Sequence, residues 1–273
     1  FGYEENLPEF EQDMERVKNA LLAYAWDEES GYFGYAVQGQ DGVHILRTEA
    51  GENYNKGVDG VTPLIAGICS KEQEKQLLKH LKSPEELWSP VGISTVDMSA
   101  SYYYDNGYWN GSVWCPYQYF LWKAMLDIGE GQFAFDIAHR GLNSWKQEIE
   151  FSYNTFEMIQ IETERGGWFH QFSGLSTPIS IWYNAYYKRG TLTTGYDTWI
   201  EKKEISEDVD HAEIIYSTTG THTGVLLIVM NSLYHYDVEI DGKKAEFIER
   251  EKGVIEITLN RKEGVIIIYR DEK

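Results

Sequence analysis

Cysteine is scarce in this chain, and long apolar runs are absent. Only two of the 273 residues are cysteines, Cys69 and Cys115, and neither has a His or Cys nearby at metal-ligand spacing. We therefore expect two buried free thiols rather than a disulfide framework or a metal site. No stretch approaches the roughly 20 apolar residues that a transmembrane helix needs, so we expect no membrane partner.

Positively charged residues are also few. The chain has 24 Lys and Arg against 44 Asp and Glu, which gives a formal net charge of -20 at pH 7. Nucleic acids and anionic lipids are bound through clustered Lys and Arg, so this balance argues against both as partners and favours a neutral ligand. The first residue is Phe rather than Met, so we expect that translation starts elsewhere, and the localisation stays open between cytoplasmic and secreted.

Aromatic residues are abundant instead. They make up 15% of the chain and crowd into residues 102–122 and 151–187. Rings with polar tips suit sites that are half apolar and half wet. A sugar ring offers an apolar C–H face and a rim of hydroxyls, which matches such a surface.

The apolar pattern predicts a helical part followed by a β part. Helical periodicity is found at residues 8–26, 60–68, 71–81, 112–127, 132–150 and 177–188. Ser70 is the expected cap of the third of these helices. Short β-branched runs separated by turn residues predict an antiparallel β-sandwich. We therefore expect a helical domain at residues 1–195, incomplete at its N-terminus, and a β-sandwich domain at 203–273, with Tyr196 and Trp199 packing back onto the helices.

One aromatic stretch carries side chains suited to sugar binding. Residues 102–114, YYYDNGYWNGSVW, place Asp105, Tyr108, Trp109, Asn110 and Trp114 just before a helix that carries Gln118. Flat rings beside amides and carboxylates fit the two sides of a sugar, and the glycines 107 and 111 favour the close approach of another group. The alternative is an aromatic loop that only packs against neighbouring helices.

The stretch FSYNTFEMIQIETERGGWFHQF, residues 151–172, contains three carboxylates. Glu157 lies between Phe and Met, where a carboxylate is costly to bury unless it is paired, hydrogen-bonded or protonated, so its surroundings indicate either a tuned carboxyl group or an exposed loop. Glu162 and Glu164 lie beside Arg165, and this is typical of a solvated charge cluster or a local ion pair. His170 can donate to a sugar hydroxyl or can be an ordinary structural histidine.

These motifs resemble those of the α,α-barrel glycosidases of glycoside hydrolase family 63 and their relatives among mannosylglycerate hydrolases and trehalases. YWNGSVW is similar to the family's Tyr-Trp-Arg-Gly-Pro-x-Trp signature, and NKGVDGVTPLIAG, residues 55–67, is similar to its Gly-x-Asp-Gly-x-x-Pro-Leu segment. YNTFEMI matches the segment of the family's general base through Glu157. The likeness covers roughly residues 8–192.

The resemblance implies a mainly α fold, an (α/α)6-barrel helical toroid followed by a small antiparallel β-sandwich. It implies a glycoside hydrolase that cleaves an α-linked glucosyl or related sugar with inversion and without cofactor or metal. Glu157 would be the general base. Substrate contacts would come from Trp109, Trp114, Tyr108, Asp105, Asn110, Gln118, Asp59, Lys56, Trp168 and His170.

The sequence departs from the family pattern in two ways. Asn110 stands where the signature has arginine, and Ser112 stands where it has proline, so the sugar is not determined. Family members close a ring of twelve helices, whereas only six or seven are expected here, and the family's general acid lies upstream of the matched segments. The chain thus resembles the C-terminal half of such an enzyme. Its partner would be the N-terminal half of the same enzyme or a second copy.

Three alternatives follow. Asp59 is the best acid within the chain, although the resemblance makes it a substrate contact or a helix cap. Without an acid, the chain would be a noncatalytic carbohydrate-binding or assembly fragment. A sugar epimerase would need a pair of histidines for proton transfer, for which His139 and His170 are the candidates.

Overall fold

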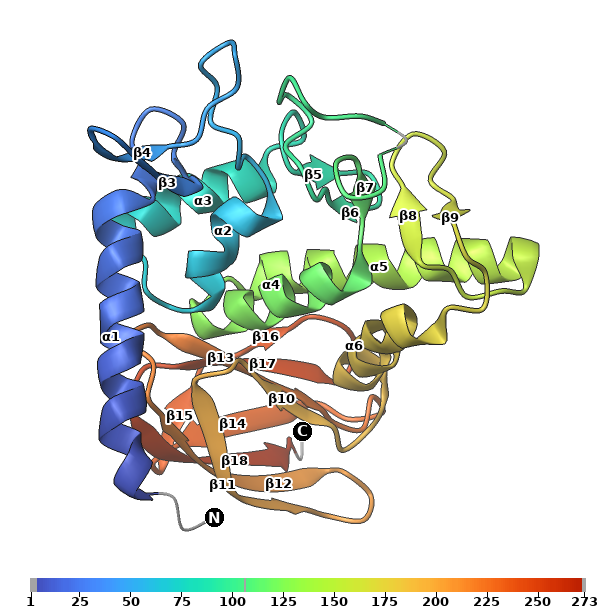
Figure 1. Ribbon diagram of the computed structural model, residues 1–273. Helices are drawn as coiled ribbons and strands as arrows, with labels where there is room; N and C mark the ends of the chain where they lie inside the picture. The colour runs from blue at the N-terminus through green and yellow to red at the C-terminus, as the bar shows by residue number, and fades with distance from the viewer. Residues whose placement is uncertain (1–3, 106, 272–273) are drawn as a thin grey trace. The chain divides into compact units, whose positions relative to one another are not determined.

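The computed structural model describes residues 4–105 and 107–271, which form two compact units (Figure 1). The first unit extends to Val113 and includes Gln160–Thr163, and the second comprises Trp114–Ile159 and the chain from Glu164 onward. The domain boundary expected between residues 195 and 203 lies inside the second unit, so that division stays a prediction.

The first unit combines helices with short hairpins. Its helices are η1 (Glu4–Asn6), α1 (Leu7–Tyr24), α2 (Val58–Ile65) and α3 (Lys71–Lys82). Its strands are β1 (Trp26–Asp27), β2 (Tyr32–Phe33), β3 (Ala36–Gly39), β4 (Gly42–Ile45), β5 (Trp88–Ser89), β6 (Gly92–Ile93) and β7 (Ser112–Val113). Three antiparallel hairpins, β1–β2, β3–β4 and β5–β6, carry the long loops between the helices.

Two helices of this unit show how the sequence sets their ends and faces. Ser70 caps α3 as expected, because its side chain accepts from the Gln73 N–H while the Gln73 side chain accepts from the Ser70 N–H. Helix α1 has the expected amphipathic sequence, but it buries none of its residues, and Phe10, Met14 and Val17 are exposed.

The second unit begins with helices and ends in strands. Its helices are α4 (Cys115–Asp127), α5 (Gly131–Ser152), η2 (Ser173–Ser176) and α6 (Thr177–Tyr187), and between α5 and η2 lie β8 (Met158–Gln160) and β9 (Gly166–Gly167). The described residues thus contain six α-helices, matching the lower of the numbers expected. These helices do not by themselves establish a closed barrel, which stays a prediction.

The β-sandwich is confirmed, and it starts earlier than expected. One sheet has the order β10 (Leu192–Thr194), β13 (Gly224–Val229), β17 (Val254–Leu259), β16 (Ile248–Glu249). The other has the order β11 (Thr198–Ile205), β12 (His211–Thr218), β18 (Glu263–Arg270), β14 (Tyr236–Ile240), β15 (Lys243–Ala245). All pairings within the two sheets are antiparallel.

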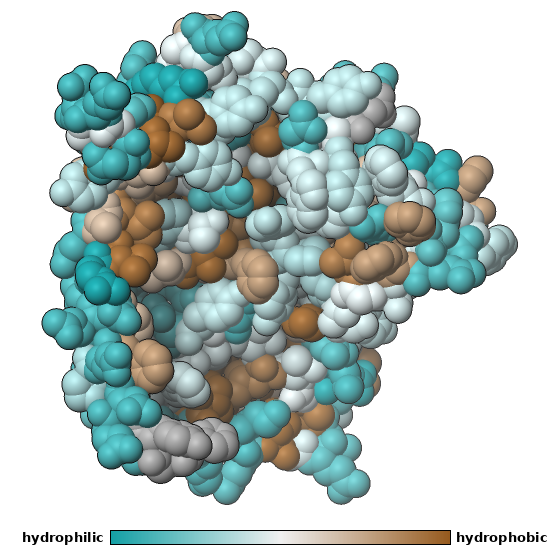
Figure 2. Space-filling model, viewed as in Figure 1, coloured by the Kyte–Doolittle hydropathy of each residue, from teal (hydrophilic) through white to brown (hydrophobic). Residues whose placement is uncertain are grey.

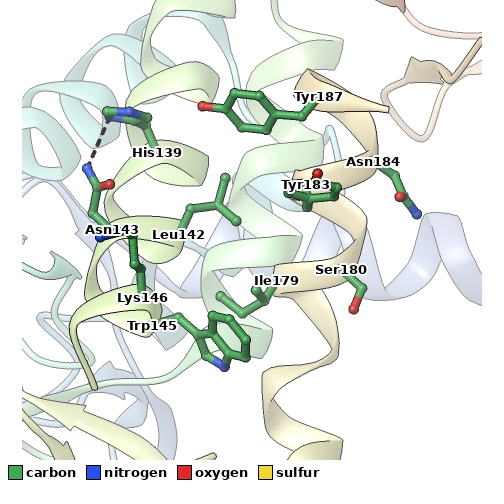
Figure 3. A pocket seen from close by; sticks show the side chains of 10 residues that line it. All are labelled: His139, Leu142, Asn143, Trp145, Lys146, Ile179, Ser180, Tyr183, Asn184 and Tyr187. Atoms are coloured by element: carbon green, nitrogen blue, oxygen red, sulfur yellow. Dashed lines mark hydrogen bonds between the residues drawn. The ribbon is translucent and has the colours of Figure 1, made fainter. Parts of the chain in front are cut away.

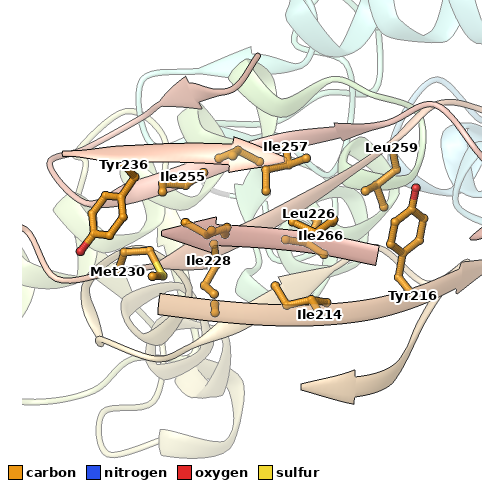
Figure 4. Close-up of a cluster of buried hydrophobic side chains, with 13 residues drawn as sticks. Ile214, Tyr216, Leu226, Ile228, Met230, Tyr236, Ile255, Ile257, Leu259 and Ile266 are labelled. Carbon is orange, nitrogen blue, oxygen red and sulfur yellow. The ribbon is translucent and has the colours of Figure 1, made fainter. Parts of the chain in front are cut away.

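Alternating side chains from both sheets fill the sandwich core (Figure 4). On β12, for example, Ala212, Ile214 and Tyr216 point inward, and the residues between them point outward. The junction before this sandwich behaves only in part as expected. Tyr196 contacts α4, since Lys123 lies over its ring and Asp127 accepts from its N–H, whereas Trp199 is 62% exposed.

Hydrophilic residues dominate the face drawn in Figure 2, with apolar side chains scattered among them. None of the helices in the described residues is long and apolar enough to cross a membrane. Cys69 and Cys115 are free thiols, but only Cys115 is buried as expected, since Cys69 is partly exposed; burial raises the pKa of each to about 12.

Candidate active site

The predicted site residues are divided between the two units. Lys56, Asp59, Asp105, Tyr108, Trp109 and Asn110 belong to the first, and Trp114, Gln118, Glu157, Trp168 and His170 belong to the second. Each group is therefore described within its own unit.

The loop that carries Trp109 is closed by its own backbone. The Tyr104 N–H donates to the Asn110 carbonyl at 2.9 Å, and the Asn110 side-chain amide donates to the Tyr102 carbonyl at 3.0 Å. A Cβ at Gly111 would lie 1.7 Å from the Tyr104 carbonyl oxygen. The close approach predicted by this glycine is therefore made by the protein's own backbone, and Asn110 serves to hold the loop.

The same loop presents aromatic surface and a carboxylate. Trp109 is 54% exposed, and its ring meets that of Tyr108 edge to face, with 5.4 Å between the centroids. Asp105 is exposed and accepts a hydrogen bond from Tyr103, whose pKa is raised to about 12 by burial and then by this carboxylate. A flat exposed indole near a hydrogen-bonding carboxylate is the combination that a sugar requires.

Lys56 lies in a dense polar network. Its Nζ lies 3.2 Å from Glu52 Oε1, 3.2 Å from Ser99 Oγ and 3.4 Å from Asp97 Oδ2, and its side chain is only 16% exposed. The Lys56 ammonium has three N–H donors and three protein partners, so a structural role explains this residue most simply. Its role as a substrate contact stays a prediction.

Asp97 anchors this network and was missed by sequence reasoning. Its carboxylate is fully buried, and it accepts from the Tyr32 hydroxyl at 3.0 Å and from the Ser99 N–H at 2.8 Å. Ligand atoms of His80, Glu86 and Asp97 lie within 4.8 Å of one another. Because the Lys56 ammonium and the Tyr32 hydroxyl already approach Asp97, these residues fit a buried polar network better than a cation site.

Asp59 lies in the first turn of α2, where the helix dipole favours a carboxylate. It is exposed and accepts from the Tyr35 hydroxyl at 3.0 Å. This placement agrees with a helix-end or substrate-contact role.

Glu157 is the buried carboxylate that the sequence predicts in the second unit. It is 7% exposed and directly precedes β8, with Phe156 and Met158 buried on either side. Strand β8 pairs with β9 through Met158 and Gly167, and the Gln171 N–H donates to the Thr155 carbonyl at 2.8 Å. These bonds hold the backbone on both sides of Glu157.

A second carboxylate of this unit, Glu148 of α5, organises the same loop. Arg165 donates to it at 2.7 and 3.2 Å, and the Gly166 N–H donates at 3.0 Å. Although burial opposes it, these hydrogen bonds lower the pKa of Glu148. The expected local ion pair between Arg165 and Glu162 or Glu164 is therefore wrong, because Arg165 pairs with Glu148 of α5, 17 residues earlier in the chain. Glu162 and Glu164 are both solvent-exposed, as expected.

The other predicted contacts of this unit differ in burial. Trp168 and His170 are exposed on the loop after β9, and Trp168 has a left-handed backbone, with φ of 62°. Trp114 and Gln118 are buried at the start of α4. Their roles as sugar contacts stay predictions, and the loop residues are the more accessible of the two pairs.

A groove of about 510 Å³ lies between α5 and α6 (Figure 3). It is lined by His139, Leu142, Asn143, Trp145, Lys146, Ile179, Ser180, Tyr183, Asn184 and Tyr187. His139 contacts Asn143 and stacks on Phe135, and His170 is not among the lining residues. The groove does not bring these two histidines together, so the epimerase alternative gains no support.

Comparison with known proteins gives a family and a fold. A model of the mannosylglycerate hydrolase MGH1-like glycoside hydrolase domain matches residues 1–157. The solved GH63 mannosylglycerate hydrolase from Thermus thermophilus, in complex with glucose, is similar over 65% of this chain and 41% of its own, with a TM-score of 0.51 and 22% identity. An uncharacterized conserved protein from the same organism is similar over 65% of this chain and 41% of its own, with a TM-score of 0.52 and 21% identity.

A more distant similarity is to the neutral trehalase from Saccharomyces cerevisiae, over 63% of this chain and 30% of its own, with a TM-score of 0.46 and 18% identity. No curated protein sequence matches. The chain spans about two fifths of the length of the Thermus hydrolase, and at these identities the likeness to the Thermus structures shows a shared fold.

Proposed function

The chain belongs to the mannosylglycerate hydrolase MGH1-like glycoside hydrolase domain family, and on that basis we propose that it supplies the general base of a glycosidase. The reaction is cleavage of an α-linked glucosyl or related sugar with inversion of configuration. The observation that carries the proposal is Glu157, a carboxylate buried in an apolar setting on a backbone held from both sides.

Glu157 acts on water in this proposal. A buried carboxylate held in one geometry can take a proton from a water molecule as that water attacks the anomeric carbon. Inversion requires room for the water, which places the acid partner roughly 6.5–9.5 Å from the base. The Glu148–Arg165 pair supports this role because it fixes the loop that follows Glu157.

The exposed rings provide the sugar-binding surface. Trp109 of the first unit and Trp168 of the second are exposed indoles, and Asp105, Asp59 and His170 are exposed polar side chains suited to bind hydroxyls. Asn110 acts by holding the loop that carries Trp109, and Lys56 acts within the polar network around Asp97.

The general acid is proposed to come from a further helical segment, most simply the N-terminal half of the same enzyme, with a second copy of this chain as the alternative. The length of the Thermus hydrolase and the helical faces that this chain leaves exposed support that view. If no acid is supplied, the chain acts as a carbohydrate-binding or assembly fragment. The presence of Asn110 in place of the signature arginine is compatible with this alternative.

The test is hydrolysis of a panel of α-linked disaccharides by the chain, alone and with the upstream segment supplied, with the anomeric configuration followed by NMR. We expect an inverted product and a loss of turnover of about 10²- to 10⁴-fold in Glu157→Gln, with sugar binding retained. Glu162→Gln and Glu164→Gln are matched controls because both side chains are exposed in the same loop. A retained configuration, or full activity in Glu157→Gln, would contradict the proposal.

A further inference from the structure

Helix α1 carries an apolar stripe that the described residues leave uncovered. The helix has an amphipathic sequence, yet none of its residues is buried. An amphipathic helix of a globular protein normally packs such a stripe against the core. The stripe consists of apolar side chains that recur every three or four residues and are exposed, apart from the half-buried Leu21: Leu7, Phe10, Met14, Val17, Leu21 and Tyr24.

The spacing of the α1 stripe is that of a coiled-coil seam. Its members follow one another after three, four, three, four and three residues, from Leu7 to Tyr24, which are the first and last residues of α1. Side chains with this spacing enter the gaps between those of a second helix with the same repeat. Figure 1 shows α1 as one unbroken helix, so the seam is continuous. The stripe therefore fits another helix better than a small molecule.

A second copy of α1 that runs antiparallel matches this seam along its full length. Each apolar side chain of the stripe then meets one of the other copy, and neither end of the seam is left over. The antiparallel direction also places the positive end of each helix dipole beside the negative end of the other. The layers of the seam pair Leu7 with Tyr24, Phe10 with Leu21, and Met14 with Val17.

The charges beside the stripe favour the same arrangement. Glu11 and Lys18 lie on one flank of it, and between antiparallel helices Glu11 faces Lys18 of the second copy, twice by symmetry. Lys18 pairs with Glu15 of its own helix at 3.1 Å, an exposed pair that can be exchanged at little cost. Parallel helices would bring Lys18 to Asp13 instead, and Asp13 already pairs with Arg16 at 3.0 Å.

We propose that the α1 stripe is a dimerisation surface, through which two copies of this chain pack their α1 helices antiparallel. The seam is only 18 residues long, so we expect a dimer that dissociates at micromolar concentrations. The inference uses no residue of the candidate active site or of the groove between α5 and α6, and it does not depend on the proposed hydrolysis.

The test is sedimentation equilibrium of the full chain over micromolar concentrations, at about 0.15 M salt so that the repulsion between the net charges is screened. We expect a monomer–dimer equilibrium. Met14→Glu places a charge in the middle of the seam and should weaken dimerisation at least about tenfold. Because Met14 is 72% exposed, the unfolding midpoint should not change. The control Gln12→Glu adds the same charge on the opposite face of α1 and should leave dimerisation and stability unchanged.

An exchange of charges tests the direction of the pairing. Glu11→Lys or Lys18→Glu alone turns two attractive pairs into two repulsive ones, and each should weaken the dimer about three- to thirtyfold. The double variant restores opposite charges between antiparallel helices, so it should recover wild-type dimerisation. Between parallel helices, Lys18→Glu would face Asp13, and the double variant would stay weak.

The two sets of variants together decide the inference. A dimer that Met14→Glu disrupts and the double charge variant restores supports it, whether or not hydrolysis is found. A chain that stays monomeric at every concentration would overturn it and would leave the α1 stripe to the upstream segment. A dimer that Met14→Glu does not weaken, or that the double variant does not restore, would also overturn it.

Discussion

At the scale of single residues, two buried glutamates of the second unit have different surroundings. Glu148 is enclosed by Arg165 and the Gly166 N–H, so its charge is compensated by the protein. Glu157 lies between two buried apolar side chains. We assign Glu148 to structure, because Arg165 and the Gly166 N–H bind its oxygens, whereas the chemical role proposed for Glu157 rests on its burial and on the held backbone around it.

The Glu148–Arg165 pair makes a prediction about pH. Its hydrogen bonds hold the pKa of Glu148 below the ordinary value of 4.5, so the folded state gains stability from this group above that pH and loses it as the pH falls toward the lowered pKa. Glu148→Gln should cost about 1–3 kcal/mol of unfolding free energy at pH 7, and the cost should shrink below pH 4.5. Urea unfolding at several pH values measures this. Glu150→Gln, in an exposed pair with Lys146, is the control, and an equal loss in both variants would refute the assignment.

At the scale of elements, the shape of the loop from Tyr102 to Gly111 determines where the exposed Trp109 ring lies. Its turn is set by backbone bonds between Tyr104, Gly107 and Asn110. The position of Trp109 therefore depends on a glycine that carries no chemistry itself.

Gly111→Ala should disturb this loop, because the new Cβ would lie 1.7 Å from the Tyr104 carbonyl oxygen, a backbone atom that cannot move alone. We expect a loss of about 1–3 kcal/mol in unfolding free energy and a changed near-ultraviolet circular dichroism spectrum from the nearby rings. Gly174→Ala is the matched control, since a Cβ there meets nothing within 4 Å. Identical spectra and stability for wild type and Gly111→Ala would show that the loop shape does not depend on this residue.

The elements also show how far the sequence can be interpreted. Periodicity located the helices that match α3, α4, α5 and α6, and the cap at Ser70 has a local chemical signal. The two-residue strands β5, β6, β7 and β9 were missed, since two residues have no periodicity, and β7 lies where the pattern placed the start of a helix. Among the aromatic residues of α6, Trp182 and Tyr186 are buried, while Tyr183 and Tyr187 are exposed and line the groove between α5 and α6.

Long-range contacts explain the rest of what the sequence did not reveal at the site. Glu157 stood out because its apolar neighbours are adjacent in sequence. Arg165 was assigned to the wrong glutamates because its partner comes from α5, and Asp97 gave no signal because Lys56 and Tyr32 reach it from distant segments.

At the scale of the whole molecule, the chain carries a family match over residues 1–157, and 65% of it shares a fold with 41% of the Thermus hydrolase. Within this chain, Asp59 is the one acid candidate that the sequence nominates, and it is exposed at the start of α2. The central claim is therefore best tested with a substrate that needs the base and not the acid.

Such substrates are α-glucosyl and α-mannosyl fluoride, because fluoride departs without being protonated. The measurement is fluoride release by the full chain, with the configuration of the released sugar followed by NMR. We predict release with inversion, a rate about 10²- to 10⁴-fold lower in Glu157→Gln, and unchanged rates in Glu162→Gln and Glu164→Gln. Fluoride release no faster than in buffer alone, or an undiminished rate in Glu157→Gln, would contradict the assignment of Glu157 as the general base.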